Sequence, residues 1–213
     1  MSTDPLIGRL TAELQPVRRQ SPRRAALILA LLCVVEIVVL LSLGWMRPDM
    51  PRAMGMPSFW WKTASLTVIM VIGATTTLRS LNPTRSPRPG LRALGYVVLA
   101  ALAAGWVIDA AQVGPIVLWR RLDPVHGLRC ARKIIELSLP VALALGVIVR
   151  RGASVDPRGT AWAAGSAAAA WGALAFVMAC PFDDPLYVAV WYSLGCGVVS
   201  LVTRLALPWL TRW

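Results

Sequence analysis

Two cysteines are the residues of this sequence best suited to chemistry. Of the four cysteines, Cys33 and Cys196 lie inside long apolar stretches, where cysteine packs as a small hydrophobic residue. Cys130 and Cys180 lie at the ends of such stretches, beside charged residues. Because thiolates bind soft metal ions and react with oxidants, this pair predicts a metal or redox sensor. A structural disulfide in an oxidising compartment explains the same two residues equally well.

The surroundings of the pair favour reactivity. The cations that follow and precede Cys130 in sequence are expected to stabilise its thiolate; they are Arg129, Arg132 and Lys133. His126, the only histidine, lies four residues before Cys130, and two aspartates, Asp183 and Asp184, follow Cys180. The sequence therefore predicts a soft-metal site of two thiolates, with His126 and a carboxylate as further ligands.

The elements that carry these residues are predicted to be membrane-spanning helices. The chain is 57% hydrophobic and 15% charged, whereas soluble domains carry about 25% charged residues. Apolar stretches of about 20 residues, the length that crosses a bilayer, are separated by charged loops. We expect an all-α, polytopic membrane bundle of about six helices, over residues 25–46, 59–78, 91–111, 128–149, 159–179 and 186–207. Lys62, near the start of the second, is expected to extend toward the lipid headgroups.

The loop charges predict the orientation of the bundle. Fourteen of the 22 Lys and Arg residues fall on the side that holds both termini. By the positive-inside rule, the N-terminus and the C-terminus are both cytoplasmic. The helices over 128–149 and 159–179 are expected to be antiparallel neighbours, because a short loop joins them. Cys130 and Cys180 should then meet at the same height on the outer side.

The sequence divides into an N-terminal cytoplasmic segment, residues 1–24, and a six-helix domain, residues 25–213. In the segment, Asp4 and Pro5 suit the start of a helix. Its apolar stripe is formed by Ile7, Leu10, Leu14 and Val17. Such a helix can lie on the inner leaflet, held by nearby arginines, or it can dock in the groove of a protein partner.

Other function classes find less support. No catalytic triad, phosphate-binding loop or zinc-protease motif is present, so we expect no enzymatic activity. The net charge of +12 is spread over loop ends, as the positive-inside rule requires, so direct nucleic-acid binding is not expected. Glu36, in the first helix, is expected to be protonated or bonded to the threonines at 75–77. It keeps a small proton-coupled or metal transporter as the alternative.

Several motifs together resemble a known family. They are L-x-x-x-L-x-P-V-R-R at 10–19, Cys130 at the head of the fourth helix, R-R-G-A at 150–153 with Pro157, and C-P-x-D-D-P-x-Y-x-x-x-W-Y at 180–192. The chain is similar to the NrsF-type negative regulators, which are six-span anti-sigma factors of the bacterial inner membrane that act on extracytoplasmic-function (ECF) sigma factors. The likeness extends over essentially the whole chain.

The resemblance implies roles for these residues. The N-terminal segment would hold an ECF sigma factor at the membrane, through Leu10, Leu14, Pro16, Val17, Arg18 and Arg19. Cys130 and Cys180 would sense heavy metal or oxidative stress and trigger release. The partners would be the sigma factor and the lipid bilayer. No cofactor would be obligatory, although a heavy-metal ion would bind transiently at the two cysteines.

Overall fold

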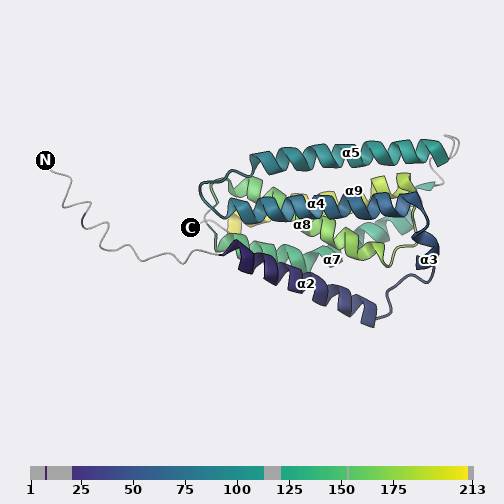
Figure 1. The fold of residues 1–213 in the computed structure, drawn as a ribbon, viewed down its shortest axis with the longest axis horizontal. Coiled ribbons are helices and arrows are strands. Elements are labelled where there is room, and N and C mark those ends of the chain that lie inside the picture. The colour runs from purple at the N-terminus through teal and green to yellow at the C-terminus, as the bar shows by residue number, and fades with distance from the viewer. Residues whose placement is uncertain (1–7, 9–20, 113–120, 153, 211–213) are drawn as a thin grey trace.

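The protein is all-helical, as predicted. A computed structural model describes residues 8, 21–112, 121–152 and 154–210, and none of these forms a strand. Six long helices run up and down through the bundle, and one short helix, α3, lies in a connection (Figure 1). The bounds are α2 Pro22–Ser42, α3 Met50–Ala53, α4 Pro57–Ser80, α5 Arg88–Gln112, α7 Pro124–Arg150, α8 Pro157–Val177 and α9 Pro185–Leu210.

Asp-Pro pairs begin the last three long helices. Asp123 accepts hydrogen bonds from the backbone N–H groups of Val125 and His126 at the start of α7. The carboxylate of Asp156 accepts one from the Gly159 N–H at the start of α8. The carboxylate of Asp184 accepts hydrogen bonds from the Leu186 and Tyr187 N–H groups at the start of α9. In each case a proline occupies the first helical position, where a backbone N–H would have no partner within the helix, so the Asp-Pro pair marks the start of the helix.

Helix α8 is the centre of the bundle, because its small residues let three neighbours approach closely. Most of its residues are buried. A Cβ atom added to Gly172 would lie 2.6 Å from the Ser138 backbone nitrogen of α7, and one added to Gly165 would lie 2.9 Å from the Ser200 Cα of α9. A Cβ atom added to Gly73 of α4 would lie 3.0 Å from the Ala167 Cβ of α8. These close approaches make α8 a packing face of small residues, as is common where membrane helices touch.

Four helices of the described chain are long and apolar enough to cross a membrane by themselves. They are α2, α5 up to Ala110, α8 and α9. Helices α4 and α7, with 24 and 27 residues, match them in length but carry more polar residues. Both pack against α8, whereas α2 and α5 lie at opposite edges of the bundle (Figure 1). The predicted number of six spans thus exceeds the four that composition alone supports.

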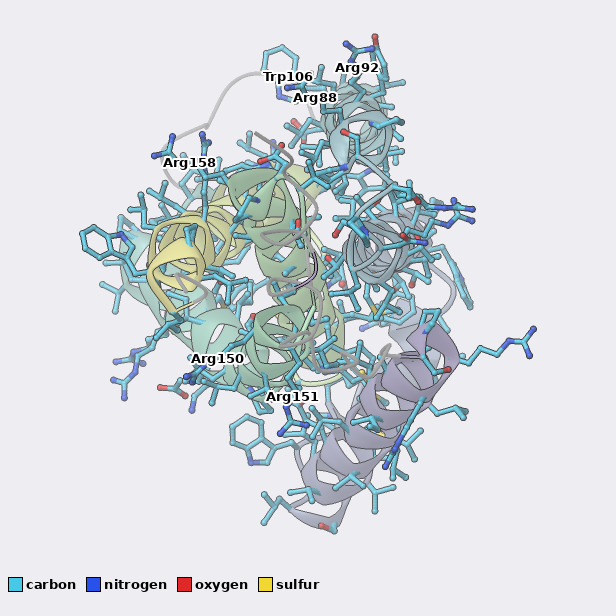
Figure 2. The ribbon with its side chains drawn as sticks, turned by 90° about the vertical axis from the view of Figure 1, so that its left-hand side faces the viewer. Arg88, Arg92, Trp106, Arg150, Arg151 and Arg158 are labelled. Atoms are coloured by element: carbon cyan, nitrogen blue, oxygen red, sulfur yellow. The ribbon has the colours of Figure 1, made fainter. Side chains whose placement is uncertain are left out.

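The two ends of the bundle differ in charge. The terminal end, where α2 begins and α9 ends, carries a group of arginines that includes Arg88, Arg92, Arg150, Arg151 and Arg158 (Figure 2). The opposite end, where α8 ends and α7 and α9 begin, is called the cysteine end here. Among the described residues, every ion pair lies in the half of the bundle nearer the cysteine end, so positive charge there is largely neutralised.

Candidate functional site: a buried pair of thiols

Cys130 and Cys180 meet inside the cysteine end. Cys130 lies in the second turn of α7, and Cys180 lies in the connection between α8 and α9. Their side chains are within hydrogen-bonding reach of each other, and both are free thiols. The two residues thus lie at one end of the bundle, the relative height that the sequence predicts. Both are nevertheless buried, with exposed fractions of 6% and 0%, so a reagent reaches them only when the bundle opens.

Aromatic side chains enclose the thiols. The Cys130 Sγ lies 3.2 Å from the Tyr187 hydroxyl, and the Tyr187 ring stacks on Phe182 at 4.7 Å between centroids. Trp191 donates a hydrogen bond to the Leu122 carbonyl, which fastens the start of α7 to α9. The buried Tyr192 hydroxyl lies next to the Cys180 thiol, so it forms part of the same enclosure.

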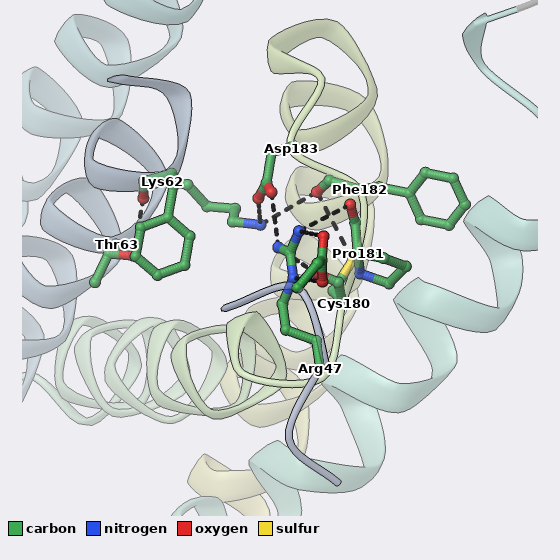
Figure 3. Close-up of polar contacts among 9 residues, drawn as sticks. Arg47, Lys62, Thr63, Cys180, Pro181, Phe182 and Asp183 are labelled. Atoms are coloured by element: carbon green, nitrogen blue, oxygen red, sulfur yellow. Dashed lines mark hydrogen bonds and ion pairs between the residues drawn. The ribbon is translucent and has the colours of Figure 1, made fainter. Parts of the chain in front are cut away.

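A cluster of three charged residues holds the Cys180 connection in place. The Asp183 carboxylate accepts a 2.6 Å hydrogen bond from the Lys62 ammonium and a 2.7 Å bond from the Arg47 guanidinium (Figure 3). The three side chains are 6%, 0% and 2% exposed, respectively. We call Asp183, Lys62 and Arg47 the Asp183 cluster. Such buried charges are stable only when they are paired and hydrogen-bonded.

Lys62 therefore differs from its prediction. It does not extend toward headgroups; its ammonium turns inward and also donates to the Phe182 carbonyl at 3.2 Å. The inward orientation follows from the buried carboxylate of Asp183, because an unpaired charge at this depth would be costly. The sequence offered one signal, a lysine inside an apolar stretch, but it did not identify the partner.

Cys180 is the activated thiol of the pair. The hydrogen bond with Cys130 lowers the pKa of Cys180 to about 6, and the nearby positive charge of Lys62 acts in the same direction against the effect of burial. From the sequence, three neighbouring cations predict thiolate character for Cys130. Two of these, Arg132 and Lys133, instead pair with Glu136 on the same helix, at 2.7 and 2.9 Å.

His126 is not assembled into a metal site. Its Nδ1 lies 2.6 Å from an oxygen of Asp123, and its side chain is half-exposed. Within the described ranges, no group of three or more His, Cys, Asp or Glu residues is arranged to hold a metal ion. The predicted site of two thiolates, an imidazole and a carboxylate is thus not present in this conformation, and the thiol pair stands alone.

Asp184 fastens the same connection to the other side of the bundle. Arg121 donates two hydrogen bonds of 2.8 Å to Asp184 and binds Asp109 of α5 through both of its terminal nitrogens. The two adjacent aspartates thus reach different partners. Asp183 reaches the α2–α3 connection and α4, and Asp184 reaches Arg121 and through it α5. The positive charge of Arg121, which precedes α7, is therefore neutralised by acids from other parts of the chain.

The comparisons with known proteins place this arrangement in a family. The family model of the negative regulator of sigma F, NrsF, matches residues 10–213. The chain belongs to the NrsF family. It is similar to the anti-sigma-F factor NrsF of Caulobacter vibrioides, at 33% identity, and to the probable anti-sigma-F factor NrsF of Azospira oryzae, at 28% identity; each alignment covers the whole of both chains. No solved structure matches this chain.

Membership of the NrsF family identifies the chain as a regulator of a sigma factor, which fits the absence of catalytic motifs in the sequence. The transporter alternative rested on Glu36. In the structure Glu36 accepts a 2.8 Å hydrogen bond from the Trp171 indole, and the hydroxyls of Thr75 and Thr77 bond to backbone carbonyls of their own helix. The predicted bond to the threonine run is therefore wrong.

The residues predicted to bind the sigma factor lie outside the described residues. They are Leu10, Leu14, Pro16, Val17, Arg18 and Arg19, and the Asp4-Pro5 pair precedes them. Their roles stay predictions. The family model nevertheless begins at residue 10, so the match includes this segment.

Proposed function

We propose that this NrsF family member is a membrane anti-sigma factor that holds an ECF sigma factor at the cytoplasmic membrane and releases it when Cys130 and Cys180 react. Family membership supports the sigma-factor partner. Helices long and apolar enough to span a bilayer support the membrane location. The single observation that carries the sensing role is the convergence of two thiols from different elements in one buried site.

We also propose the six-span topology with both termini in the cytoplasm. Helices α4 and α7 are about 36–40 Å long at 1.5 Å per residue, enough to cross a ~30 Å hydrocarbon core beside α8. The six long helices alternate in direction, so α2 begins and α9 ends at the same end. That end carries the arginines labelled in Figure 2. Such an excess of arginine is typical of cytoplasmic loops. The cysteine end then faces the periplasm.

The thiol pair suits two kinds of signal. Soft ligands such as thiolates select soft metal ions, and a thiophilic ion can bridge Cys130 and Cys180 with loss of their protons. A peroxide can instead oxidise the Cys180 thiolate to a sulfenic acid, with release of hydroxide or alcohol. The Cys130 thiol then attacks that sulfur to give a disulfide and water. Both reactions change the separation and charge of the two sulfurs.

The N-terminal segment is the proposed sigma-binding element. Its apolar stripe and the arginines that follow suit a helix that docks in a groove of the sigma factor. It connects directly to α2, the helix at the edge of the bundle. In this proposal, a change at the cysteine end that moves α2 also moves the binding segment, because the segment directly precedes α2 in sequence.

Co-purification tests the anti-sigma function. Tagged full-length protein and a variant lacking residues 1–22 are solubilised from the native membranes, and co-purifying sigma factors are identified by mass spectrometry. We expect a sigma factor with the full-length protein and its loss on truncation. The same assay on the double variant Leu10→Asp with Leu14→Asp tests whether the apolar stripe is needed for binding when the arginines are kept. Absence of any sigma factor from the full-length sample would contradict the proposed function.

A further inference from the structure

The Asp183 cluster joins the cysteine site to α2. Arg47 lies five residues beyond the end of α2, after Gly44, whose φ of 71° turns the chain back toward the bundle. Its backbone N–H donates to the Met178 carbonyl at 2.9 Å. Its guanidinium donates to the carbonyl of Cys180 at 2.9 Å and to the Asp183 carboxylate at 2.7 Å (Figure 3). It also donates to the Pro181 carbonyl at 3.3 Å, so one arginine binds the Cys180 connection at four points.

Helix α2 has few other attachments. Most of its apolar side chains are exposed, and only Ala25 and Leu29, near its start, are buried. Glu36 bonds to Trp171 in its middle. At its far end α2 diverges from the other helices (Figure 1). Between α2 and α3 the chain contacts the bundle at Trp45, whose ring lies 4.9 Å from the Lys133 ammonium of α7, and at Arg47, whose side chain is buried. The buried, hydrogen-bonded contacts of Arg47 therefore fix the position of that end more firmly than the contact of Trp45.

We propose that Arg47, acting on Asp183 and Cys180, is the positioning residue that couples the chemistry of the cysteine pair to α2 and so to retention of the sigma factor. This inference rests on the proposed function. The cluster forms in the thiol state described here and stabilises the retaining arrangement. Bridging or oxidation of Cys130 and Cys180 moves the connection that carries Asp183 and the Cys180 carbonyl. Arg47 then loses its acceptors, and α2 is free to shift.

Arg47 and Asp183 each have a second partner of opposite charge. The second partner of Arg47 is Asp49, at 2.7 Å, and the Asp49 side chain is 44% exposed. Asp183 has a second cation, Lys62. When the Arg47–Asp183 contact breaks, each charge keeps one partner, so the opened state leaves no buried charge unpaired. A switch needs such a second state that is only modestly less stable than the first.

The test compares sigma-factor dissociation constants with and without Hg²⁺, in full-length protein reconstituted in vesicles. The variant is Arg47→Gln, which leaves the Lys62–Asp183 pair intact. We expect its dissociation constant without Hg²⁺ to rise at least about tenfold, a typical coupling, toward the value of Hg²⁺-treated wild-type protein. The further increase caused by Hg²⁺ should fall toward none.

Asp49→Asn is the matched control. It removes a carboxylate from the same arginine but does not contact the Cys180 connection. Without Hg²⁺ we expect the wild-type dissociation constant, because the Arg47–Asp183 contact is kept. With Hg²⁺ the increase should be no larger than in wild-type protein, because the opened state lacks the second carboxylate of Arg47. A merely structural role for Arg47 would lower the yield of folded protein and leave the Hg²⁺-induced ratio unchanged. Binding of one Hg²⁺ per thiol pair, checked in each variant, reports that the site has formed.

If Arg47→Gln does not bind Hg²⁺ at the thiol pair, a second variant, Lys62→Met with Asp183→Asn, tests the coupling instead. It removes the shared carboxylate together with one cation, so Arg47 keeps Asp49. The same rise and loss of response are expected. Wild-type dissociation constants in a variant that binds Hg²⁺ would overturn the coupling while leaving the proposed function intact. Failure of the wild-type protein to respond to Hg²⁺ would overturn both.

Discussion

At the scale of residues, the structure makes the two cysteines unequal. Cys180 has the positive charge of Lys62 nearby and the Cys130 thiol as a hydrogen-bond donor, so its thiolate is favoured even though the side chain is buried. Cys130 faces the Tyr187 hydroxyl. Because the thiolate is the nucleophile and the metal ligand, the proposed sensing reaction would begin at Cys180, and Cys130 would complete the bridge. The sequence suggested the opposite assignment, from cations that follow Cys130 but bind Glu136.

This inequality predicts a distinct pH profile. The alkylation rate of Cys180 should rise with pH with its midpoint at about 6, the lowered pKa, and level off at higher pH, where the thiolate fraction is nearly complete. In Cys130→Ala the largest cause of the lowered pKa is lost, so the midpoint should move up toward the ordinary value for cysteine. Peptide mass spectrometry after iodoacetamide pulses at each pH measures both. A Cys180 midpoint unchanged by Cys130→Ala would contradict the proposed hydrogen bond.

At the scale of elements, α8 organises the bundle through its glycines and alanines. Gly172 brings α7 close enough for Cys130 to reach the connection that follows α8, since both lie on the same side of this contact. An Ala- and Gly-rich sequence favours close packing, because small residues are common where membrane helices touch. The partners of each glycine were not predictable, since they depend on the register between helices.

Gly172→Ala is expected to destabilise the bundle by about 1–3 kcal/mol, the usual cost of overpacking. The added methyl group would lie within 3 Å of the backbone of both Ile134 and Ser138, which cannot move independently of α7. Gly197→Ala is the control, because nothing lies within 4 Å of its added methyl group. Thermal unfolding in detergent measures the two. Equal melting temperatures would show that α7 and α8 do not pack at Gly172.

The limits of prediction are clearest at the Asp183 cluster. The helices, their Asp-Pro starts and the meeting of Cys130 with Cys180 follow from sequence periodicity, capping chemistry and a short loop between antiparallel helices. Arg47 and Lys62 could not be assigned, because each lies more than a hundred residues from Asp183 and long-range ion pairs leave no local pattern. The contact of His126 with Asp123, three residues before it, was likewise not assigned from the sequence, and a sensing role for His126 stays a prediction.

At the scale of the whole molecule, charge separates the two ends. The cysteine end pairs its cations with acids, and the terminal end gathers arginines such as Arg88, Arg150 and Arg158. In the proposed topology, which follows the positive-inside rule, the terminal end lies in the cytoplasm. The sensor and the sigma-binding segment would then lie on opposite sides of the bilayer, so that any signal between them must pass through the helices.

Membrane-impermeant maleimide labelling tests this orientation. Single cysteines are introduced in a background without the native four, at Val155 near the terminal end and at Met54 near the cysteine end; both side chains are exposed. In intact spheroplasts we expect labelling at position 54 and none at position 155 until the membrane is permeabilised. The reverse pattern would exclude cytoplasmic termini, and labelling of both would exclude a bundle that spans the bilayer.

The central claim is that reaction of Cys130 and Cys180 releases a sigma factor. The most direct measurement is the amount of sigma factor retained by vesicles carrying the full-length protein, before and after Hg²⁺ is added on the side of the cysteine end. Wild-type protein should lose most of its sigma factor, and Cys130→Ser with Cys180→Ser should retain it, because a hydroxyl pair does not bind a soft ion. Release from the double variant equal to that from wild-type protein would contradict the account.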